Sequence, residues 1–302
     1  MTRQLIVGMP ESGKSTYIGA LRHVLVAKQV DTELELMMLA GDEQHLNALE
    51  EKWLSCEAME RTKTSNEGWV ELNVRDKATE ATALMTIPDL RGENFERPAV
   101  AGGCPRDLHE ALIASDGILL FTNVNHEDDM LLIDDFGDIP DDEDEEEAED
   151  DVEAGAGVKL EGNGENGHEH DDGRGQFRPQ DMGEEIKIVE FLQMANRRPL
   201  FPKRRKIALV ASAWDLIADD DADMTPEKWL AAKRPMLDQF LAYNADMWEL
   251  RVYGISAQGG SLPQRRAEFE NMLNQSERVR VVGHGAGKHD LTAPLRWLMG
   301  VV

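Results

Sequence analysis

Residues 4–21, QLIVGMPESGKSTYIGAL, decide the fold of this chain. An apolar run at 4–8 leads into a loop with the spacing GxxxxGKS, from Gly8 to Ser15, and a pattern of helical period follows directly. Gly8 and Gly13 allow the tight turn in which backbone N–H groups face inward, and the start of the helix adds its dipole. The stretch therefore predicts a loop that binds the phosphates of a nucleoside diphosphate or triphosphate.

The residues of this loop have separate expected roles. Lys14 would reach the β- and γ-phosphates and stabilise charge during catalysis, and Ser15 would be a ligand of Mg²⁺. The phosphate contacts would come from the loop and the first helical turn, which comprise Gly8, Glu11, Ser12, Gly13, Lys14, Ser15 and Thr16.

Short apolar runs alternate with helical patterns along the chain, which is typical of an α/β domain with a mostly parallel sheet. We predict six strands, at 4–8, 69–74, 81–89, 117–124, 206–214 and 248–256. We predict helices at 14–28, 43–58 and 184–196, one from a Thr225 cap to about 243 with a kink at Pro235, and one capped by Thr292.

The second and third predicted strands are joined by a turn with no room for a helix, so they should form an antiparallel hairpin. The alternation of WVELNV favours 69–74 as an edge strand with one solvated face. The expected fold is thus a six-stranded, mostly parallel sheet with one antiparallel edge hairpin and helices on both faces.

An acidic segment interrupts this pattern. Between residues 127 and 172 there are 22 acidic residues against a single lysine, so −21 of the net charge of −27 falls there. Such a composition has too little apolar surface to offset its ordering entropy, and we expect a flexible insertion at 127–180. The domain would then be built from 1–126, with a helical insert at about 31–60, and from 181–302.

Composition also excludes some classes of function. The acidic balance argues against a nucleic-acid partner, because phosphate contacts need clustered lysine and arginine. Cys56 and Cys104 form no CxxC pattern, which favours a reducing, cytoplasmic setting, and we expect no metal site there. No stretch approaches the roughly 20 apolar residues that a membrane span requires.

The third predicted strand ends in TIPDLRGENF (86–95), which places Asp89 and Gly92 at DxxG spacing. With the phosphate loop, the hairpin and the strand order, this resembles the Ras-like, translation-factor-related class of P-loop GTPases. The resemblance implies GTP or GDP with Mg²⁺ as ligands, Asp89 holding the ion through water, and the Gly92 N–H at the γ-phosphate. Glu93 stands where that class has the glutamine that orients water; its carboxylate can still accept from water, but its charge would slow hydrolysis.

The stretch EAMERTKTSNEGWVEL (57–72) offers Thr62 and Thr64, one of which would be the switch threonine that binds Mg²⁺. Arg61 lies three residues before Thr64, the spacing at which alpha subunits of heterotrimeric G proteins supply a catalytic arginine. A closer likeness, carried by LAGDEQHLNALEEKWL (39–54) and HDLTAPLRWLM (289–299), is to the bacterial double-GTPase group of conflict and signalling systems. That likeness favours Thr62, and it implies effector or regulatory protein partners.

Two further stretches concern the base. The Ras-like class reads guanine with NKxD after the fifth strand, and the aligned residues here are Ser212, Ala213, Trp214 and Asp215, so only the aspartate is present. GISAQGG (254–260) resembles the SAK-type loop, with Ser256 and Ala257 at the matching positions. The alternatives are that Asp215 caps a helix and that GISAQGG is an ordinary glycine turn.

Three functions are compatible with these patterns. The leading one is a Mg²⁺-dependent GTPase that switches between GTP and GDP. The second is a nucleotide-binding interaction module with little or no hydrolysis, which the charge of Glu93 keeps open. The third is a P-loop ATPase or kinase, which is less favoured because the sequence shows no separate base and no arginine-rich lid.

Overall fold

The computed structural model describes residues 1–40, 43–57, 70–87, 93–125, 178–179, 182–197, 204–218, 221 and 223–301. Apart from Arg178, these residues belong to one compact unit. The predicted acidic insertion falls outside the described residues, except for its last few positions. Within the part of the chain that the structure describes, no helix combines the length and the apolar character that crossing a membrane requires.

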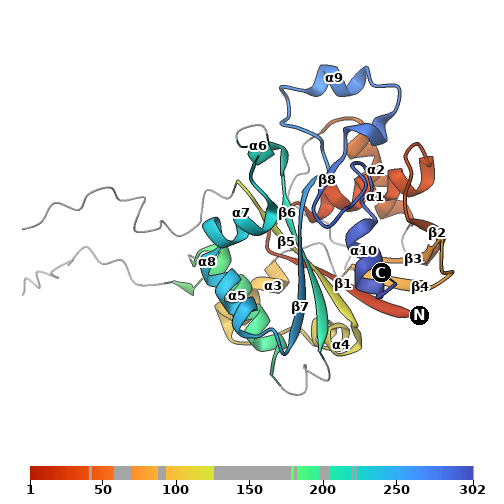
Figure 1. Cartoon of the computed structure of the whole chain (residues 1–302). Coiled ribbons are helices and arrows are strands. Elements are labelled where there is room, and N and C mark those ends of the chain that lie inside the picture. The colour runs from red at the N-terminus through yellow and green to blue at the C-terminus, as the bar shows by residue number, and fades with distance from the viewer. Residues whose placement is uncertain are drawn as a thin grey trace, which may run out of the picture. The chain divides into compact units, whose positions relative to one another are not determined.

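One mixed sheet forms the centre of the fold (Figure 1). Its eight strands in the described residues are β1 (Thr2–Gly8), β2 (Leu34–Ala40), β3 (Val70–Asp76), β4 (Thr82–Ile87), β5 (Gly117–Asn123), β6 (Arg205–Ser212), β7 (Trp248–Ser256) and β8 (Arg280–Val282). Their order across the sheet is β2-β3-β4-β1-β5-β6-β7-β8. The central strands β4, β1, β5, β6 and β7 are parallel, while β2–β3, β3–β4 and β7–β8 pair antiparallel.

Helices cover both faces of this sheet. The helices in the described residues are α1 (Lys14–Ala27), α2 (Glu43–Leu54), α3 (Glu93–Ala101), α4 (Arg106–Ala114), α5 (Glu184–Ala195), α6 (Asp215–Ala218), α7 (Pro226–Lys233), α8 (Pro235–Tyr243), α9 (Arg266–Glu270) and α10 (Ala293–Met299), with a 3-10 turn, η3 (Gln275–Arg278). One apolar core joins the sheet to α1, α2 and α10, and a second joins its opposite face to α3, α4, α5, α7 and α8.

Adjacent residues of β1 show how the strands divide between these cores. The side chain of Ile6 belongs to the α1 side, whereas Leu5 and Val7 belong to the α5 side, as the two-residue period of a strand requires. All three are buried, so β1 is apolar throughout, in the manner of a strand covered on both faces. The sequence pattern QLIVG therefore reports a central strand.

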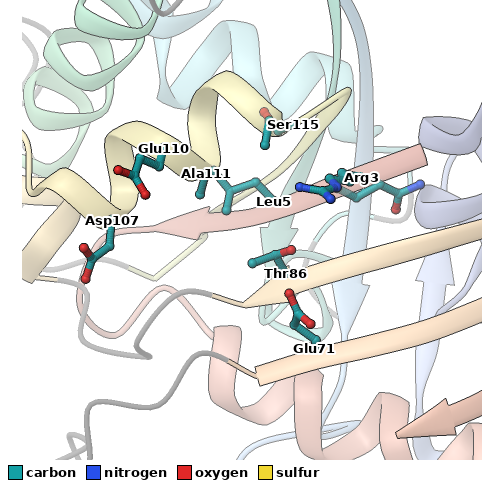
Figure 2. A pocket seen from close by; sticks show the side chains of 10 residues that line it. Arg3, Leu5, Glu71, Thr86, Asp107, Glu110, Ala111 and Ser115 are labelled. Atoms are coloured by element: carbon teal, nitrogen blue, oxygen red, sulfur yellow. The ribbon is translucent and has the colours of Figure 1, made fainter. Parts of the chain in front are cut away.

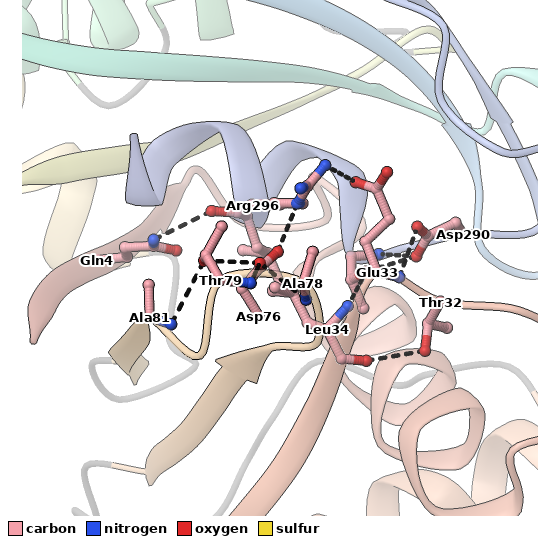
Figure 3. A network of polar contacts seen from close by, with 12 residues as sticks. Gln4, Thr32, Glu33, Leu34, Asp76, Ala78, Thr79, Ala81, Asp290 and Arg296 are labelled. Carbon is pink, nitrogen blue, oxygen red and sulfur yellow. Dashed lines mark hydrogen bonds and ion pairs between the residues drawn. The ribbon is translucent and has the colours of Figure 1, made fainter. Parts of the chain in front are cut away.

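A polar network fixes α10 to the turn between β3 and β4 (Figure 3). Arg296 forms ion pairs with the fully buried Asp76 and with Glu33, the latter at 3.0 Å. Asp76 also accepts from the backbone and hydroxyl of Thr79, both at 2.7 Å, and these bonds lower its pKa despite its burial. The network therefore anchors the end of the hairpin that lies away from the carboxyl ends of the parallel strands.

The predicted sheet was short by two strands. β2 lies within the stretch predicted as a helical insert, and its bulge between Leu36 and Met38 explains why a regular alternation is missing from the sequence. β8 has only three residues, too few for a period to appear. Because β2 pairs with β3, the strand predicted at 69–74 is not an edge strand, although its antiparallel pairing with β4 is confirmed.

Two predicted helix ends also differ. Pro235 separates two helices, α7 and α8, instead of kinking one, because a proline disfavours helical backbone at the residue before it. Thr225 caps α7 as predicted, accepting from the Lys228 N–H. Thr292 stands before α10, but its hydroxyl donates to Asp290 and accepts from the Leu34 N–H, so it does not cap through its side chain.

Candidate functional site

The loop between β1 and α1 has the tight, glycine-dependent backbone that its sequence predicts. Its backbone is left-handed at Glu11, with φ 60°, and at Gly13, with φ 89°. A Cβ added at Gly13 would lie 2.7 Å from the Ser212 hydroxyl oxygen, and one at Gly8 would lie 2.5 Å from that of Ser12. Both glycines are therefore required by close packing, and at Gly13 also by the backbone conformation.

Lys14 lies inside this loop. Its ammonium donates to the carbonyls of Gly8 and Met9, at 2.7 and 2.6 Å, and to the Ser12 hydroxyl at 3.1 Å. Burial lowers the pKa of Lys14 to about 7, although the carboxylates of Glu184, Glu93 and Glu96 act in the opposite direction. The negative charge of a polyphosphate bound here would stabilise the protonated ammonium, which has lost its hydration, and would raise the pKa of Lys14 again.

The start of α1 adds to the positive character of the loop. Gly13 at the cap position makes no side-chain cap, and the first turn of α1 contains no acidic residue. The N-terminal dipole is therefore not compensated locally, which favours an anion at this end. Ser15 and Thr16 lie half-buried in this first turn, and Ser15 is the described member of the predicted metal-ligand set.

A cavity of about 220 Å³ continues from this loop along the carboxyl ends of β5, β6 and β7. This edge of parallel strands is where open α/β sheets bind ligands. The cavity brings together predicted residues from three separate stretches. Its lining consists of Glu11, Gly13, Thr16, Asn123, Ser212, Ala213, Asp215, Leu216, Ser256, Ala257, Gln258, Gly260 and Ser261.

Asp215 lies just after the carboxyl end of β6 and is buried, with 6% of its surface exposed. Its Oδ1 accepts a hydrogen bond from the Ser256 hydroxyl, which in turn accepts from the Gly259 N–H at 3.1 Å. This bond joins the two stretches that were predicted to read the base, and both of its residues line the cavity. The bonded partner of this carboxylate oxygen is therefore the last residue of β7 and not a backbone N–H of α6. A carboxylate has more acceptor positions than one serine uses, so Asp215 retains capacity for a ligand.

The other residues of the SAWD stretch have structural tasks. Ser212 donates to the Ser12 carbonyl at 2.9 Å and so ties β6 to the phosphate loop. Ala213 has a left-handed backbone, with φ 58°, and lines the cavity. Trp214 is buried against Gly254, where an added Cβ would lie 2.3 Å from the indole.

Several predicted residues fall outside the described part of the chain. These are Arg61, Thr62, Thr64, Asp89 and Gly92, so their roles remain predictions. Glu93 is described: it is exposed at the first position of α3 and contributes to the electrostatic environment of Lys14. Two residues later Phe95 is buried against Phe191, and its ring centroid lies 5.9 Å from the Lys14 ammonium. The start of α3 is therefore anchored beside the phosphate loop.

A buried polar group behind the loop was not predicted. Glu184, the first residue of α5, accepts from the Thr122 hydroxyl at 3.0 Å and lies 3.5 Å from the Arg234 guanidinium. Arg234 also donates to the Asn123 carbonyl at 3.0 Å. Glu184 is the foremost of the carboxylates that raise the pKa of Lys14. No sequence motif marks these residues, because their partners lie about 50 to 110 positions apart along the chain.

A second, larger cavity of about 290 Å³ does not contain any of the predicted nucleotide-binding residues. Figure 2 shows it between α4 and the sheet, with Leu5 and Thr86 on its floor. Its charged lining consists of Glu71, Asp107 and Glu110 against the single cation Arg3, so its net charge opposes a polyphosphate. We therefore place the candidate site in the smaller cavity beside the phosphate loop.

The fold and this loop define an α/β protein of the P-loop type. A sequence model of the Double-GTPase 1 family matches residues 5–298, nearly the whole chain. The chain therefore belongs to the Double-GTPase 1 family, which confirms the likeness drawn from the sequence. No curated protein matches the chain at a significant level.

Solved structures give more distant likenesses. The GTPase-like domain of S. cerevisiae Ski7 is similar in its GTP-bound form (12% identity, TM-score 0.41, 86% of this chain and 43% of that chain). Its form with GDP and inorganic phosphate is also similar (12%, TM-score 0.46, 99% and 49%). The Arl6 BBS3 small GTPase from Trypanosoma brucei is a third (8%, TM-score 0.35, 89% and 94%). The chain matches less than half the length of the two Ski7 structures, and the family assignment rests on the family match alone.

Proposed function

We propose that this protein is a Mg²⁺-dependent GTPase that acts as a GTP/GDP switch. The observation that carries the proposal is the cavity in which the phosphate loop, Asp215 and the loop from Ser256 to Ser261 meet. The arrangement supports one ligand with phosphates at one end and a base at the other. The membership in the Double-GTPase 1 family supports the same activity.

At the phosphate end, Lys14 and the N–H groups of the loop and first helical turn would bind the β- and γ-phosphates. Ser15 would hold Mg²⁺ together with one of Thr62 and Thr64 and, through water, Asp89; the ion would neutralise charge on the phosphates when bound. Glu93 would accept a hydrogen bond from the attacking water. Gly92 would sense the γ-phosphate, and Arg61 would stabilise charge in the transition state.

At the base end, Asp215 would accept from the N1–H and the exocyclic amine of guanine, and the Ala257 N–H would donate to the guanine oxygen. Adenine has no donors at those positions and would leave a buried carboxylate unpaired, at a cost of roughly 1–3 kcal/mol. The Ser256 hydroxyl supports this role, because it orients the carboxylate. Ala213 stands where a lysine would stack on the base, so affinity for the base would be lower than in proteins with that lysine.

Turnover is the direct test of this proposal. Purified protein is mixed with GTP and excess Mg²⁺, and phosphate release is followed with and without EDTA. We expect slow release of phosphate that requires Mg²⁺, and little release from ATP. Tight GTP binding without any Mg²⁺-dependent release would instead support a nucleotide-binding interaction module, which the negative charge of Glu93 near Lys14 makes the second candidate.

Glu93 provides a separate prediction about catalysis. Replacing Glu93 with alanine removes the acceptor for the attacking water, and we expect single-turnover hydrolysis to slow by about 10- to 100-fold. Glu93→Gln keeps an acceptor and removes the charge, so its rate should equal or exceed that of the unmodified protein. GDP affinity should be unchanged in both variants, because Glu93 would act at the γ-phosphate, which GDP lacks.

Glu110→Gln is the charge-matched control, since Glu110 is an exposed glutamate on α4 that pairs with Arg106 at 2.9 Å and does not contribute to the pKa shift of Lys14. Its rate should stay within about twofold of the unmodified protein. An alanine variant at Glu93 that hydrolyses GTP at the original rate would exclude this residue from the reaction.

The switch would act on other proteins. The likeness to double-GTPases of conflict and signalling systems supports effector or regulatory proteins as partners. We propose that such a partner accelerates the slow intrinsic turnover, as expected where hydrolysis depends mainly on positioning and electrostatics. Comparing hydrolysis with and without the products of neighbouring genes would test this.

A further inference from the structure

The helix α2 reaches from the phosphate-loop helix to the base-reading loop. It packs closely on α1, where a Cβ added at Gly19 would lie 2.6 Å from the Leu49 carbonyl oxygen. At its last turn Trp53 is fully buried, and its indole N–H donates to the Ala257 carbonyl at 2.9 Å. Ala257 lines the candidate base cavity, so α2 contacts the loop that would read the base.

Trp53 is itself held firmly. The buried Arg278 guanidinium donates to the Trp53 carbonyl, donates to the Cys56 sulfur at 3.1 Å, and lies 3.5 Å from the indole ring centroid. The carbonyl of Arg278 in turn lies so near Gly259 that an added Cβ there would be 2.3 Å away. The loop from Ser256 to Ser261 therefore packs against Arg278 at Gly259, and it accepts a hydrogen bond from the Trp53 indole at Ala257.

The contacts on the loop leave little freedom for Ala257. Ser256 before it is bonded to Asp215, and Gly259 after it donates to Ser256 and accepts from Arg265 at 2.7 Å. The bond from Trp53 acts on Ala257 itself. The Ala257 carbonyl belongs to the Ala257–Gln258 peptide, which is planar, whereas the Ala257 N–H belongs to the preceding peptide. The Trp53 bond therefore holds Ala257 on one side of its Cα, and the bonds of Ser256 hold it on the other.

We propose that Trp53 is a positioning residue for base recognition, which orients Ala257 so that its backbone reads the 6-oxo group of the purine. This inference rests on the proposed guanine-nucleotide site and adds a residue from α2 to it. A tryptophan that only filled the core would need some acceptor for its N–H, but that acceptor need not be a residue of the base cavity. The positioning role thus predicts that loss of the Trp53 N–H lowers affinity only for nucleotides that carry the 6-oxo group.

Trp53→Phe tests the role, because it keeps an aromatic ring and removes the donor. We expect its affinity for GDP to fall by about three- to tenfold, as for loss of one hydrogen bond that orders the loop. Affinity for the diphosphate of 2-aminopurine riboside, which keeps the amine but lacks the 6-oxo group and with it the N1 proton, should be the same in the variant and in the unmodified protein. Trp248→Phe, at a buried tryptophan at the opposite end of β7, is the control and should bind both nucleotides as the unmodified protein does.

The outcomes are distinguishable from failure of the proposed function. If the unmodified protein does not prefer GDP to ADP, the guanine site itself is wrong. If it does prefer GDP, two results with Trp53→Phe would overturn the positioning role. One is an unchanged affinity for GDP, and the other is an equal loss of affinity for GDP and for the 2-aminopurine nucleotide. Should the variant not fold, hydrogen exchange of the Trp53 indole N–H in the unmodified protein decides: GDP should slow it more than the 2-aminopurine nucleotide, and equal effects would overturn the role.

Discussion

Replacing Asp215 with asparagine is expected to weaken GDP binding by about 100-fold, because two hydrogen bonds to a buried carboxylate would be lost. The amide presents a donor where guanine also has a donor. Xanthine has an oxygen in place of the exocyclic amine, so the same variant should bind XDP more tightly than GDP. Isothermal titration with both nucleotides, in the presence of Mg²⁺, measures the exchange of preference.

Asp221→Asn is the matched control for this substitution. Asp221 is exposed in the connection between α6 and α7, six residues from Asp215, and does not line the cavity. Its GDP affinity should not change. An Asp215→Asn variant that keeps its full preference for GDP over XDP would show that the carboxylate does not face the base, and that its bond to Ser256 is only structural.

Lys14 is expected to make nucleotide binding depend on proton uptake. Its pKa is lowered to about 7 by burial, and bound phosphates would raise it, so the complex holds more protons than the free site above that pH. GDP affinity should therefore fall as pH rises above about 7, by up to roughly tenfold per pH unit. Titrations at about pH 8 in buffers of different ionisation enthalpy should show uptake of close to one proton.

Lys14→Arg separates this effect from other titrations. A guanidinium keeps its proton throughout this range, so the variant should bind GDP more weakly at pH 7 but lose most of the pH dependence. The phosphates of GDP are already ionised above pH 7, so their titration does not lower the affinity for GDP further as the pH rises. Equal pH dependence in the variant and the unmodified protein would mean that Lys14 is not the group that takes up the proton.

The sequence predicted best what depends on local pattern. The phosphate loop, the central strands and the β3–β4 hairpin follow from residue spacing, because Gly8, Gly13 and the apolar run before them have one common structural solution. β2 was missed because a bulge interrupts its alternation, and β8 because three residues carry no period. These are cases where pairing with a neighbouring strand, not the local sequence, decides the structure.

The candidate site shows the same division. Asp215 and Ser256 were each predicted from their own stretches. The bond between them could not be predicted, because it spans 41 positions of the chain. Trp53, Arg278 and the Glu184–Arg234 pair have no motif, since their importance comes from partners that only the fold brings near. Sequence reasoning thus located the residues that would touch the ligand and missed those that hold them in place.

The most direct test of the central claim is the relative affinity of the unmodified protein for GDP and ADP. Both nucleotides carry the same phosphates, so the phosphate loop cannot distinguish them, and any difference arises at the base end of the cavity. With Asp215 reading the base, we expect GDP to bind about 10- to 100-fold more tightly than ADP in the presence of Mg²⁺. Equal affinities would contradict the guanine site and leave only a phosphate site.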